Sequence, residues 1–327
     1  MNLTGVRLFA LEATRELGEA VASALGWPLT PHEERRFEDG EHKARPLAAV
    51  AEADCYVVQS LHGGPTDSVN DKLCRLLFFI GALKDAGAAR VTAIAPYLAY
   101  ARKDRRTKPF DPVTSRYVAS LFEAVGTDRL LTLEVHNPAA FENAFRGRAI
   151  TLSAASLFLD SAVRYADGPL CVLSPDPGGA KRAEQFREAL EARLGRPVGK
   201  AFADKHRSAG VLSGDLLVGE VRGATVLVVD DLVATGWTLA RAARAARDAG
   251  ALRVIAIAAH GLFMPGCDEA LGGEALERVI VGDGVPPFRI AGAPLMDKLE
   301  VVAIAPLLAD AIRRLAVGGD LTDLLVF

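Results

Sequence analysis

The chain has 327 residues, of which 50% are hydrophobic and 24% are charged, and its formal net charge is −3. These values are ordinary for a soluble globular protein, and the length suits two domains of about 150 residues each. The mildly negative charge offers no general attraction to nucleic acid or to an anionic membrane surface. No apolar run approaches the ~18 residues of a transmembrane helix, and residues 1–10 lack the pattern of a signal peptide. We therefore expect a cytoplasmic protein with neither nucleic-acid nor membrane partners.

Strand and helix patterns alternate along the chain. Short aliphatic and β-branched runs predict strands at 6–9, 55–59, 91–94, 130–133, 170–173, 225–229, 254–258 and 279–281. Amphipathic spacing predicts helices at 14–25, 69–86, 112–125, 179–194, 238–249 and 306–315. This alternation indicates an α/β fold in which a mostly parallel sheet is covered by helices on both faces.

The chain also repeats itself at an interval of about half its length. Residues 84–95 (KDAGAARVTAIA) closely match residues 247–258 (RDAGALRVIAIA), and weaker echoes pair 37–42 with 202–206 and 25–28 with 194–197. An internal repeat of this kind marks a duplicated unit. We therefore predict two similar α/β domains, 1–147 and 148–327, with the C-terminal helix able to pack back on the first half.

The most informative segment runs from Thr225 to Thr238. An apolar strand ends in two acids, and a loop of small residues then leads into a helix. Free N–H groups at a helix start and threonine hydroxyls bind phosphate, while paired carboxylates accept hydrogen bonds from vicinal sugar hydroxyls. The segment therefore predicts a pentose-phosphate site made by Asp230, Asp231, Ala234, Thr235, Gly236, Trp237 and Thr238. An Asp-capped turn without a ligand is the alternative interpretation.

Other polar segments stand out, and each also has a plain structural interpretation. Residues 37–41 (FEDGE) contain an Asp-Gly pair, which is common in hairpin turns. Residues 96–106 (PYLAYARKDRR) place a basic run at the end of a strand, where α/β proteins bind ligands, although charge runs are usually solvated surface. His136 and Asp176 each follow a predicted strand, where a lone histidine is usually a structural residue and Asp-Pro-Gly-Gly is usually a turn. Residues 203–214 contain Lys205 and Arg207 among glycines and serines, which predicts an exposed hairpin or a mobile loop that brings cations to an anion.

Together these motifs resemble those of the ribose-phosphate diphosphokinase (phosphoribosyl pyrophosphate synthetase) family, which has the type I phosphoribosyltransferase fold. The matching patterns are FxDGE, PYxxYARxDRR, DxH, SPDxGG, KxR and DDxxxTGxT, and the resemblance extends from about Val6 to Leu315. It implies two phosphoribosyltransferase-like domains, the first with ATP-binding loops and the second with the ribose 5-phosphate and catalytic loops. It also implies Mg²⁺-dependent transfer of the diphosphoryl group of ATP to the C1 hydroxyl of ribose 5-phosphate, with release of AMP. The family assembles as homodimers or as hexamers that are trimers of dimers, and we expect the same here.

The resemblance implies roles for individual residues. Lys205 and Arg207 would be catalytic, and His136 and Asp176 would hold Mg²⁺. The residues that would bind ATP are Phe37, Asp39, Glu41, Arg102, Lys103, Asp104 and His136. The pentose-phosphate loop described above, from Asp230 to Thr238, would bind ribose 5-phosphate.

The chain departs from the family pattern at several of these positions. Lys103 stands where the family often has Gln, and Glu134 where it usually has Asp. In the predicted pentose-phosphate loop, residues 230–238, which is called the sugar loop below, Ala234 and Trp237 replace a usual Asp and a usual Gly. Residues 42–46 and 137–145 also differ from the usual continuations. Two alternatives therefore stay open, namely a phosphoribosyltransferase that consumes phosphoribosyl pyrophosphate and a non-catalytic subunit that associates with a synthetase.

Overall fold

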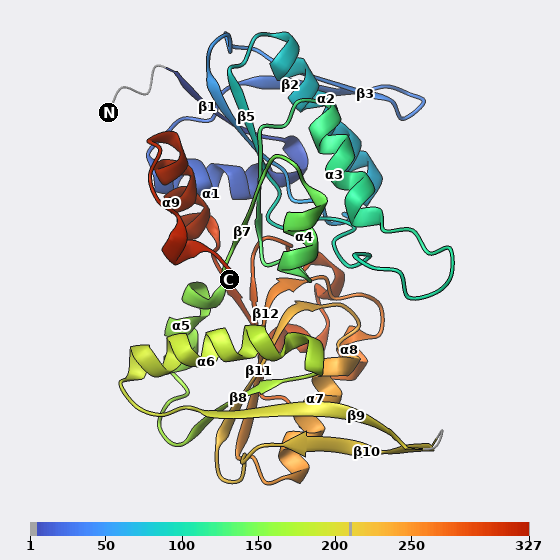
Figure 1. Cartoon of the computed structure of the whole chain (residues 1–327), viewed down its shortest axis with the longest axis vertical. Coiled ribbons are helices and arrows are strands. Elements are labelled where there is room, and N and C mark those ends of the chain that lie inside the picture. Colours follow the sequence, from blue (N-terminus) through green and yellow to red (C-terminus); the bar gives the residue numbers. More distant parts are fainter. Residues whose placement is uncertain (1–4, 209–210, 327) are drawn as a thin grey trace. The chain divides into compact units, whose positions relative to one another are not determined.

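A computed structural model of the chain describes residues 5–208 and 211–326, and the side chains of residues 204–216 lie outside this description (Figure 1). The chain forms two compact units. One contains the residues up to Ser153 and from Ile304 onward, and the other is Ala154–Ala303. The boundary predicted at Gly147 thus lies shortly before this division. The C-terminal segment belongs to the first unit, whereas the predicted range 148–327 assigns it to the second.

The first unit is built on a parallel sheet with the strand order β1-β4-β5-β6-β7. The strand bounds are β1 Val6–Ala10, β4 Asp54–Val58, β5 Arg90–Ile94, β6 Arg129–Leu133 and β7 Arg148–Leu152. Each strand is buried after its first residue or two, as expected for a sheet that helices cover on both faces. β2 (His32–Arg36) and β3 (His42–Pro46) form a separate antiparallel hairpin.

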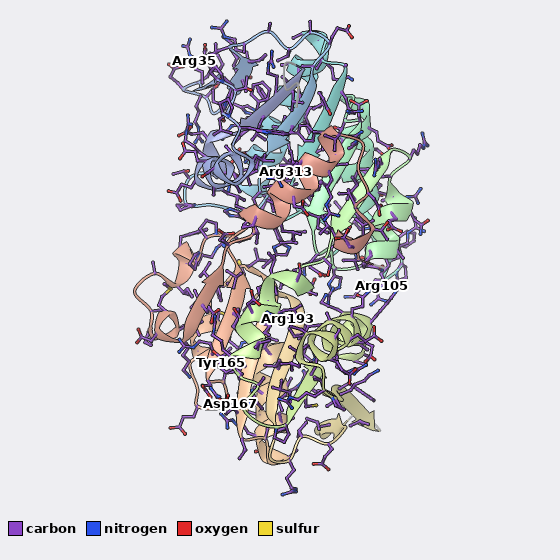
Figure 2. All side chains as sticks on the ribbon, turned by 90° about the vertical axis from the view of Figure 1, so that its left-hand side faces the viewer. Arg35, Arg105, Tyr165, Asp167, Arg193 and Arg313 are labelled. Carbon is purple, nitrogen blue, oxygen red and sulfur yellow. The ribbon has the colours of Figure 1, made fainter. Side chains whose placement is uncertain are left out.

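Helices cover the two faces of this sheet. On one face α2 (Val69–Asp85), α3 (Thr114–Ala124) and α4 (Pro138–Ala144) share a core with the strands, in which Phe79 and Phe122 are fully buried. On the other face α1 (Arg15–Leu25) and α9 (Ala305–Ala316) pack against each other (Figure 1). Gly18 of α1 lies directly on β1, because an added Cβ would come within 2.0 Å of the Ala10 Cβ. Arg313, labelled on α9 in Figure 2, donates to the Ala24 carbonyl at 3.1 Å and so ties the C-terminal helix to α1.

The second unit contains a larger sheet with the order β10-β9-β8-β11-β12-β13-β14. The bounds are β8 Leu170–Ser174, β9 Gly199–Ser208, β10 Val211–Val218, β11 Thr225–Val233, β12 Arg253–Gly261, β13 Arg278–Gly282 and β14 Leu299–Val302. Neighbouring strands are parallel except β9 and β10, which form an antiparallel hairpin at the edge.

The helices of the second unit also lie on this sheet. α7 (Trp237–Asp248) and α8 (Cys267–Leu271) share a core with the strands, and small residues such as Ala242 and Ala246 let α7 approach closely. α6 (Ala180–Leu194) packs on β8, β9 and β11 and also contacts α5 (Ala155–Val163). Short 3₁₀ helices occur in both units. Those of the first unit are η1 Glu12–Thr14 and η5 Thr322–Leu324, and those of the second are η2 Pro177–Gly179, η3 Phe288–Ile290 and η4 Pro294–Lys298.

The two units repeat one topology. In each, five parallel strands follow one another across the sheet in chain order, β1-β4-β5-β6-β7 and β8-β11-β12-β13-β14. In each unit an antiparallel hairpin follows the α-helix that comes after the first strand of this series, β2–β3 after α1 and β9–β10 after α6. The repeated segments 84–95 and 247–258 occupy equivalent places, from the end of α2 into β5 and from the end of α7 into β12. The predicted α/β fold with two duplicated domains is confirmed.

Every predicted strand and helix has a counterpart. The elements absent from the predicted ranges are β2, β3, β7, β9, β10, β14, α4, α5 and α8, and most of them are short, although β9 has ten residues and β10 has eight. β2 and β3 carry mainly charged side chains, so they lack the apolar alternation that would predict strands. Cross-strand contacts such as the ion pair of Arg45 with Glu33 at 2.7 Å help to stabilise them. The segment 203–214, for which the sequence predicts a hairpin or a mobile loop, falls on the β9–β10 hairpin as far as it is described. Within residues 5–208 and 211–326, no helix has the length and apolar character needed to cross a bilayer.

Candidate active site

In the second unit the predicted residues meet at the carboxyl edge of the sheet. β8 and β11 are parallel neighbours with Leu173 opposite Val228, so the turn that follows β8 and holds Asp176 lies beside the last part of β11, which carries Asp230 and Asp231 and still pairs with β12. β9 lies on the other side of β8 and continues past the end of that strand. This edge is where ligands bind in open α/β sheets.

Asp230 and Asp231 directly follow the fully buried run of β11, Thr225–Val229. The Asp231 residue is only 4% exposed, and its N–H donates to the Asp230 Oδ1 at 2.8 Å. Arg182 of α6 reaches both acids, with Nη1 3.8 Å from the Asp230 Oδ1 and 3.9 Å from the Asp231 Oδ1. Burial and then the charge of Asp231 raise the pKa of Asp230 far above its usual range, and Arg182 acts in the opposite direction. The two carboxyl groups thus favour a nearby cation or hydrogen-bond donor, which stabilises their ionised forms.

The loop after this pair leads into α7. Gly236 is the N-cap of α7 with φ +80°, it is buried, and an added Cβ would lie 2.7 Å from the Leu271 Cγ. No side chain caps α7, so the N–H groups of its first turn lack acceptors within the described part of the chain. Thr235 is exposed beside them, and Trp237 begins the helix with its side chain 46% exposed. A helix start of this kind is suited to bind a phosphate.

Asp176 lies in the turn between β8 and α6. Its Oδ1 accepts the Gly179 N–H at 3.0 Å, and the Ser174 hydroxyl donates to its carbonyl at 2.7 Å. Arg241 of α7 donates to the Pro175 carbonyl at 3.5 Å and links this turn to the sugar loop. No donor among the described residues contacts the Asp176 Oδ2, so one carboxylate oxygen remains for a cation.

Lys205 and Arg207 lie on β9 where the strand extends past this edge. Their backbones pair with Asp215 and Leu212 of β10, respectively. Their side chains lie outside the described residues, so the structure gives their strand position alone.

In the first unit the basic segment forms a loop between β5 and α3. Arg102 is exposed, whereas the Lys103 ammonium donates to the Asp111 Oδ2 at 2.6 Å. Asp111 also accepts hydrogen bonds from Thr107 and from the Lys108 N–H, and these contacts hold the pKa of its carboxyl well below the usual range. The positive charge of Lys103, which departs from the family pattern, is thus neutralised inside the loop.

Asp104 lies in the loop between β5 and α3, and His136 lies shortly after the end of β6 in the same unit. The Asp104 Oδ2 accepts the Asn137 Nδ2 at 2.7 Å, and Asn137 caps α4 by accepting the Ala140 N–H at 3.2 Å. His136 precedes this cap and is exposed. Glu134 is buried with φ +41°, a backbone conformation that non-glycine residues rarely adopt. The strained turn therefore aims His136 outward at the edge of the sheet.

Residues 37–41 form the turn of the β2–β3 hairpin. The Phe37 N–H donates to the Glu41 carbonyl at 2.8 Å, and the Glu41 N–H donates to the Asp39 Oδ1 at 3.0 Å. The Asp39 and Glu41 side chains are exposed, and the Arg35 guanidinium lies 4.8 Å from the centre of the Phe37 ring. The turn interpretation is confirmed, and the ligand role of Phe37, Asp39 and Glu41 stays a prediction.

The predicted residues of the second unit therefore lie at one sheet edge, whereas those of the first unit lie in separate loops. Asp176, the acid pair and the sugar loop share the sheet edge of the second unit, together with the backbones of Lys205 and Arg207. Arg102, Lys103, Asp104, His136 and the hairpin residues belong to the first unit. Within the described residues no three His, Cys, Asp or Glu side chains are placed to hold a metal ion together.

Three residues of these sets are absent from the sequence prediction, namely Arg182, Arg241 and Asp111. Each acts on a residue that is distant in sequence or lies beyond a loop, so no local motif marks it. The one usable signal is that Arg182 follows the SPDxGG motif within one helical turn.

Comparison with known proteins decides the family. Residues 6–126 match the model of the N-terminal domain of ribose phosphate pyrophosphokinase, residues 145–262 that of the phosphoribosyl transferase domain, and residues 214–325 that of the phosphoribosyl synthetase-associated domain. The chain is 33% identical to ribose-phosphate pyrophosphokinase 1 of Streptococcus pneumoniae (strain ATCC BAA-334 / TIGR4), over 96% of this chain and 95% of that protein. The chain belongs to the ribose-phosphate pyrophosphokinase family.

Other members of the ribose-phosphate pyrophosphokinase family extend the match. The protein of Thermosipho africanus is 35% identical over 94% of each chain. The crystal structure of phosphoribosylpyrophosphate synthetase from Mycobacterium smegmatis superposes with a TM-score of 0.85 at 34% identity, covering 97% of this chain and all of that one. The predictions of an enzyme, of this family and of the phosphoribosyltransferase fold are confirmed.

Proposed function

We propose that the chain catalyses Mg²⁺-dependent transfer of the β,γ-diphosphoryl group of ATP to the C1 hydroxyl of ribose 5-phosphate. The C1 oxygen attacks the β-phosphorus, the bond from that phosphorus to the bridging oxygen of the α-phosphate breaks, AMP leaves with that oxygen, and the hydroxyl proton is released. One observation carries the proposal: the second unit joins an ion-paired acid pair to an uncapped helix start at one sheet edge. Vicinal hydroxyls fit the first feature and a phosphate fits the second.

Within the second unit the residues divide the work of holding the sugar. Asp230 and Asp231 accept hydrogen bonds from the 2- and 3-hydroxyls, and the first turn of α7 with Thr235 and Thr238 holds the 5-phosphate. Ala234 contributes backbone alone, since its carbonyl accepts the Met264 N–H at 2.9 Å. This leaves the C1 hydroxyl as the free end of the bound sugar.

ATP and Mg²⁺ complete the proposal. Arg102 engages the phosphates, and Phe37 with Asp39 and Glu41 binds the base. Asp176, with one carboxylate oxygen that no described donor contacts, suits a cation that takes most of its ligands from water and phosphate. His136 of the first unit is the other residue that the resemblance assigns to Mg²⁺. When bound, Mg²⁺ neutralises charge on the transferring phosphates. Lys205 and Arg207 add cations to the same task. We further propose that the protein is cytoplasmic and forms a homodimer or a hexamer. Light scattering after gel filtration measures the number of chains in the assembly.

The test follows AMP formation by the purified chain with ATP, Mg²⁺ and ribose 5-phosphate. AMP must appear only with the sugar phosphate present, in amounts equal to the new diphosphorylated sugar. Lys205→Ala should lower kcat by ~10²–10³, the usual effect of losing one transition-state donor. The matched control is Lys200→Ala on the same strand, because Lys200 pairs with Glu184 at 2.9 Å. Absence of AMP from the wild-type chain would reject the proposal, and phosphoribosyl pyrophosphate with a panel of bases would then test the transferase alternative.

A further inference from the structure

Arg182 is placed to act on the two acids at once. It lies in the first turn of α6 with its side chain 16% exposed, and its Nη1 is 3.8 Å and 3.9 Å from the Asp230 and Asp231 carboxylates. The turn that holds Asp176 closes against the same group, because a Cβ added to Gly179 would lie 3.8 Å from the Arg182 Nη1. The guanidinium therefore sits between the acid pair and the Asp176 turn.

Without this guanidinium the acid pair is electrostatically unfavourable. Two adjacent carboxylates repel each other, and burial penalises their charged forms. Burial and Asp231 raise the pKa of Asp230, while Arg182 lowers it. A protonated Asp230 would lose acceptor capacity, and a carboxylate without a partner would be free to turn away.

We propose that Arg182 is a positioning residue that holds the Asp230 and Asp231 carboxylates as paired acceptors for the vicinal hydroxyls of the sugar. This inference rests on the proposed function, since it takes ribose 5-phosphate as the ligand. A direct role as a phosphate ligand is disfavoured by the same contacts. A guanidinium that neutralises two carboxylates attracts a further anion weakly, and the phosphate has its own site at the start of α7.

Other charged groups on the elements around this end of β11 set the background for any pH effect. They are Lys181 on α6, Asp176 in the preceding turn, His260 on β12 and Arg241 on α7. Arg241 donates to the Pro175 carbonyl, so its contact there is with backbone. Arg182 is the cation for which contacts to both acids are resolved.

The experiment compares Arg182→Met and Arg182→Lys with the wild-type chain. Calorimetry without ATP measures ribose 5-phosphate affinity from pH 6 to pH 9, and steady-state kinetics gives KM for each substrate. Arg182→Met should weaken ribose 5-phosphate binding roughly 10- to 100-fold, as for the loss of a hydrogen bond to a charged group. KM for ATP should stay unchanged, Arg182→Lys should recover part of the affinity, and the loss should shrink as rising pH ionises Asp230.

Two controls sharpen the test. Arg187→Met removes an arginine of the same helix and the same side-chain exposure that pairs with Glu184 and Glu191, and it should leave both KM values unchanged. In an Asp230→Asn background, Arg182→Met should have little further effect on sugar affinity, which also tests the idea if the single variant folds poorly.

Three results for Arg182→Met would overturn the role of Arg182: an unchanged affinity for ribose 5-phosphate, a loss of that affinity that is constant with pH, or a raised KM for ATP alone. Normal turnover by the wild-type chain would still support the proposed function in each case. A wild-type chain that binds no ribose 5-phosphate would overturn both.

Discussion

Replacing Gly236 by Ala tests the geometry of the sugar loop most directly. Gly236 caps α7 in the left-handed region, with φ +80°. A Cβ there would lie 2.7, 3.1 and 3.2 Å from the Cγ, Cδ1 and Cδ2 atoms of Leu271, which is fully buried. The methyl group therefore meets both an unfavourable backbone conformation and a packed side chain.

The two costs can be estimated separately. An alanine in the left-handed region costs about 1–2 kcal/mol, and overpacking a buried contact costs about 1–3 kcal/mol. Gly236→Ala should therefore reduce the free energy of unfolding by about 2–5 kcal/mol. Gly266 is the matched control, because it caps α8 with φ +88° and has no neighbour within 4 Å of its added Cβ. Gly266→Ala should show the backbone cost alone.

The assay combines urea unfolding with steady-state kinetics. Because the clash moves the start of α7, Gly236→Ala should also raise KM for ribose 5-phosphate, whereas Gly266→Ala should leave it near the wild-type value. Equal losses of stability in the two variants would refute the assigned contact with Leu271. An unchanged KM in a destabilised Gly236→Ala variant would refute the assignment of this helix start to the sugar phosphate.

Three further predictions concern the core, pH and the basic loop. Gly81→Ala, at an open position in α2, should stabilise the fold by about 1 kcal/mol, whereas Gly18→Ala should lower the urea midpoint because its Cβ meets β1 at 2.0 Å. Because the pKa of Asp230 is raised in the folded chain, the stability of the ligand-free wild type should fall as pH rises through that pKa. Asp230→Asn should remove this fall, so the urea midpoint of the variant should exceed that of the wild type at pH 8 but not at pH 4. Asp111→Asn should raise KM for ATP roughly tenfold by releasing Lys103, and an unchanged KM would separate this loop from nucleotide binding.

The parts of the fold that sequence patterns predict are those buried on both sides. Aliphatic runs predict the parallel strands, and amphipathic spacing predicts the long helices between them equally well. The β2–β3 hairpin carries charge on most positions, so its strands are stabilised by each other and by ion pairs that no local pattern records. The repeat of 84–95 in 247–258 supplies part of the missing information, because it predicts that the two units share one order of elements.

Site residues divide along the same line. Asp176 and His136 are predictable because each follows a strand, and the acid pair because it comes directly after the aliphatic run of β11. Backbone direction alone brings such side chains toward the carboxyl edge of their sheet. Arg182 is not predictable in this way, since its value lies in reaching Asp230 across the space between a helix and a strand. Asp111 is similar, because its neutralisation of Lys103 depends on how the loop folds back.

The duplicated topology sharpens the question of why the sugar loop belongs to the second unit. β4 and β11 begin opposite equivalent residues of β5 and β12, since each pair starts in the same register. Gln59 and Ser60 of the first unit therefore occupy the places that Asp230 and Asp231 occupy in the second. Gln59 is fully buried, and its side-chain amide finds no partner among the described residues. The first unit thus has no carboxylate pair for sugar hydroxyls.

The helix starts differ as well. Ser68 caps α2, and its hydroxyl accepts the Asp71 N–H while the Asp71 carboxylate accepts the Ser68 N–H. These reciprocal bonds satisfy groups at the start of α2 and place a negative charge where a phosphate would bind. α7 begins instead at Gly236 without a side-chain cap, which leaves its N–H groups for a ligand. Since the two units share their backbone plan, a carboxylate pair and an open helix start, present in one unit and absent from the other, are stronger evidence for the sugar site than the fold is.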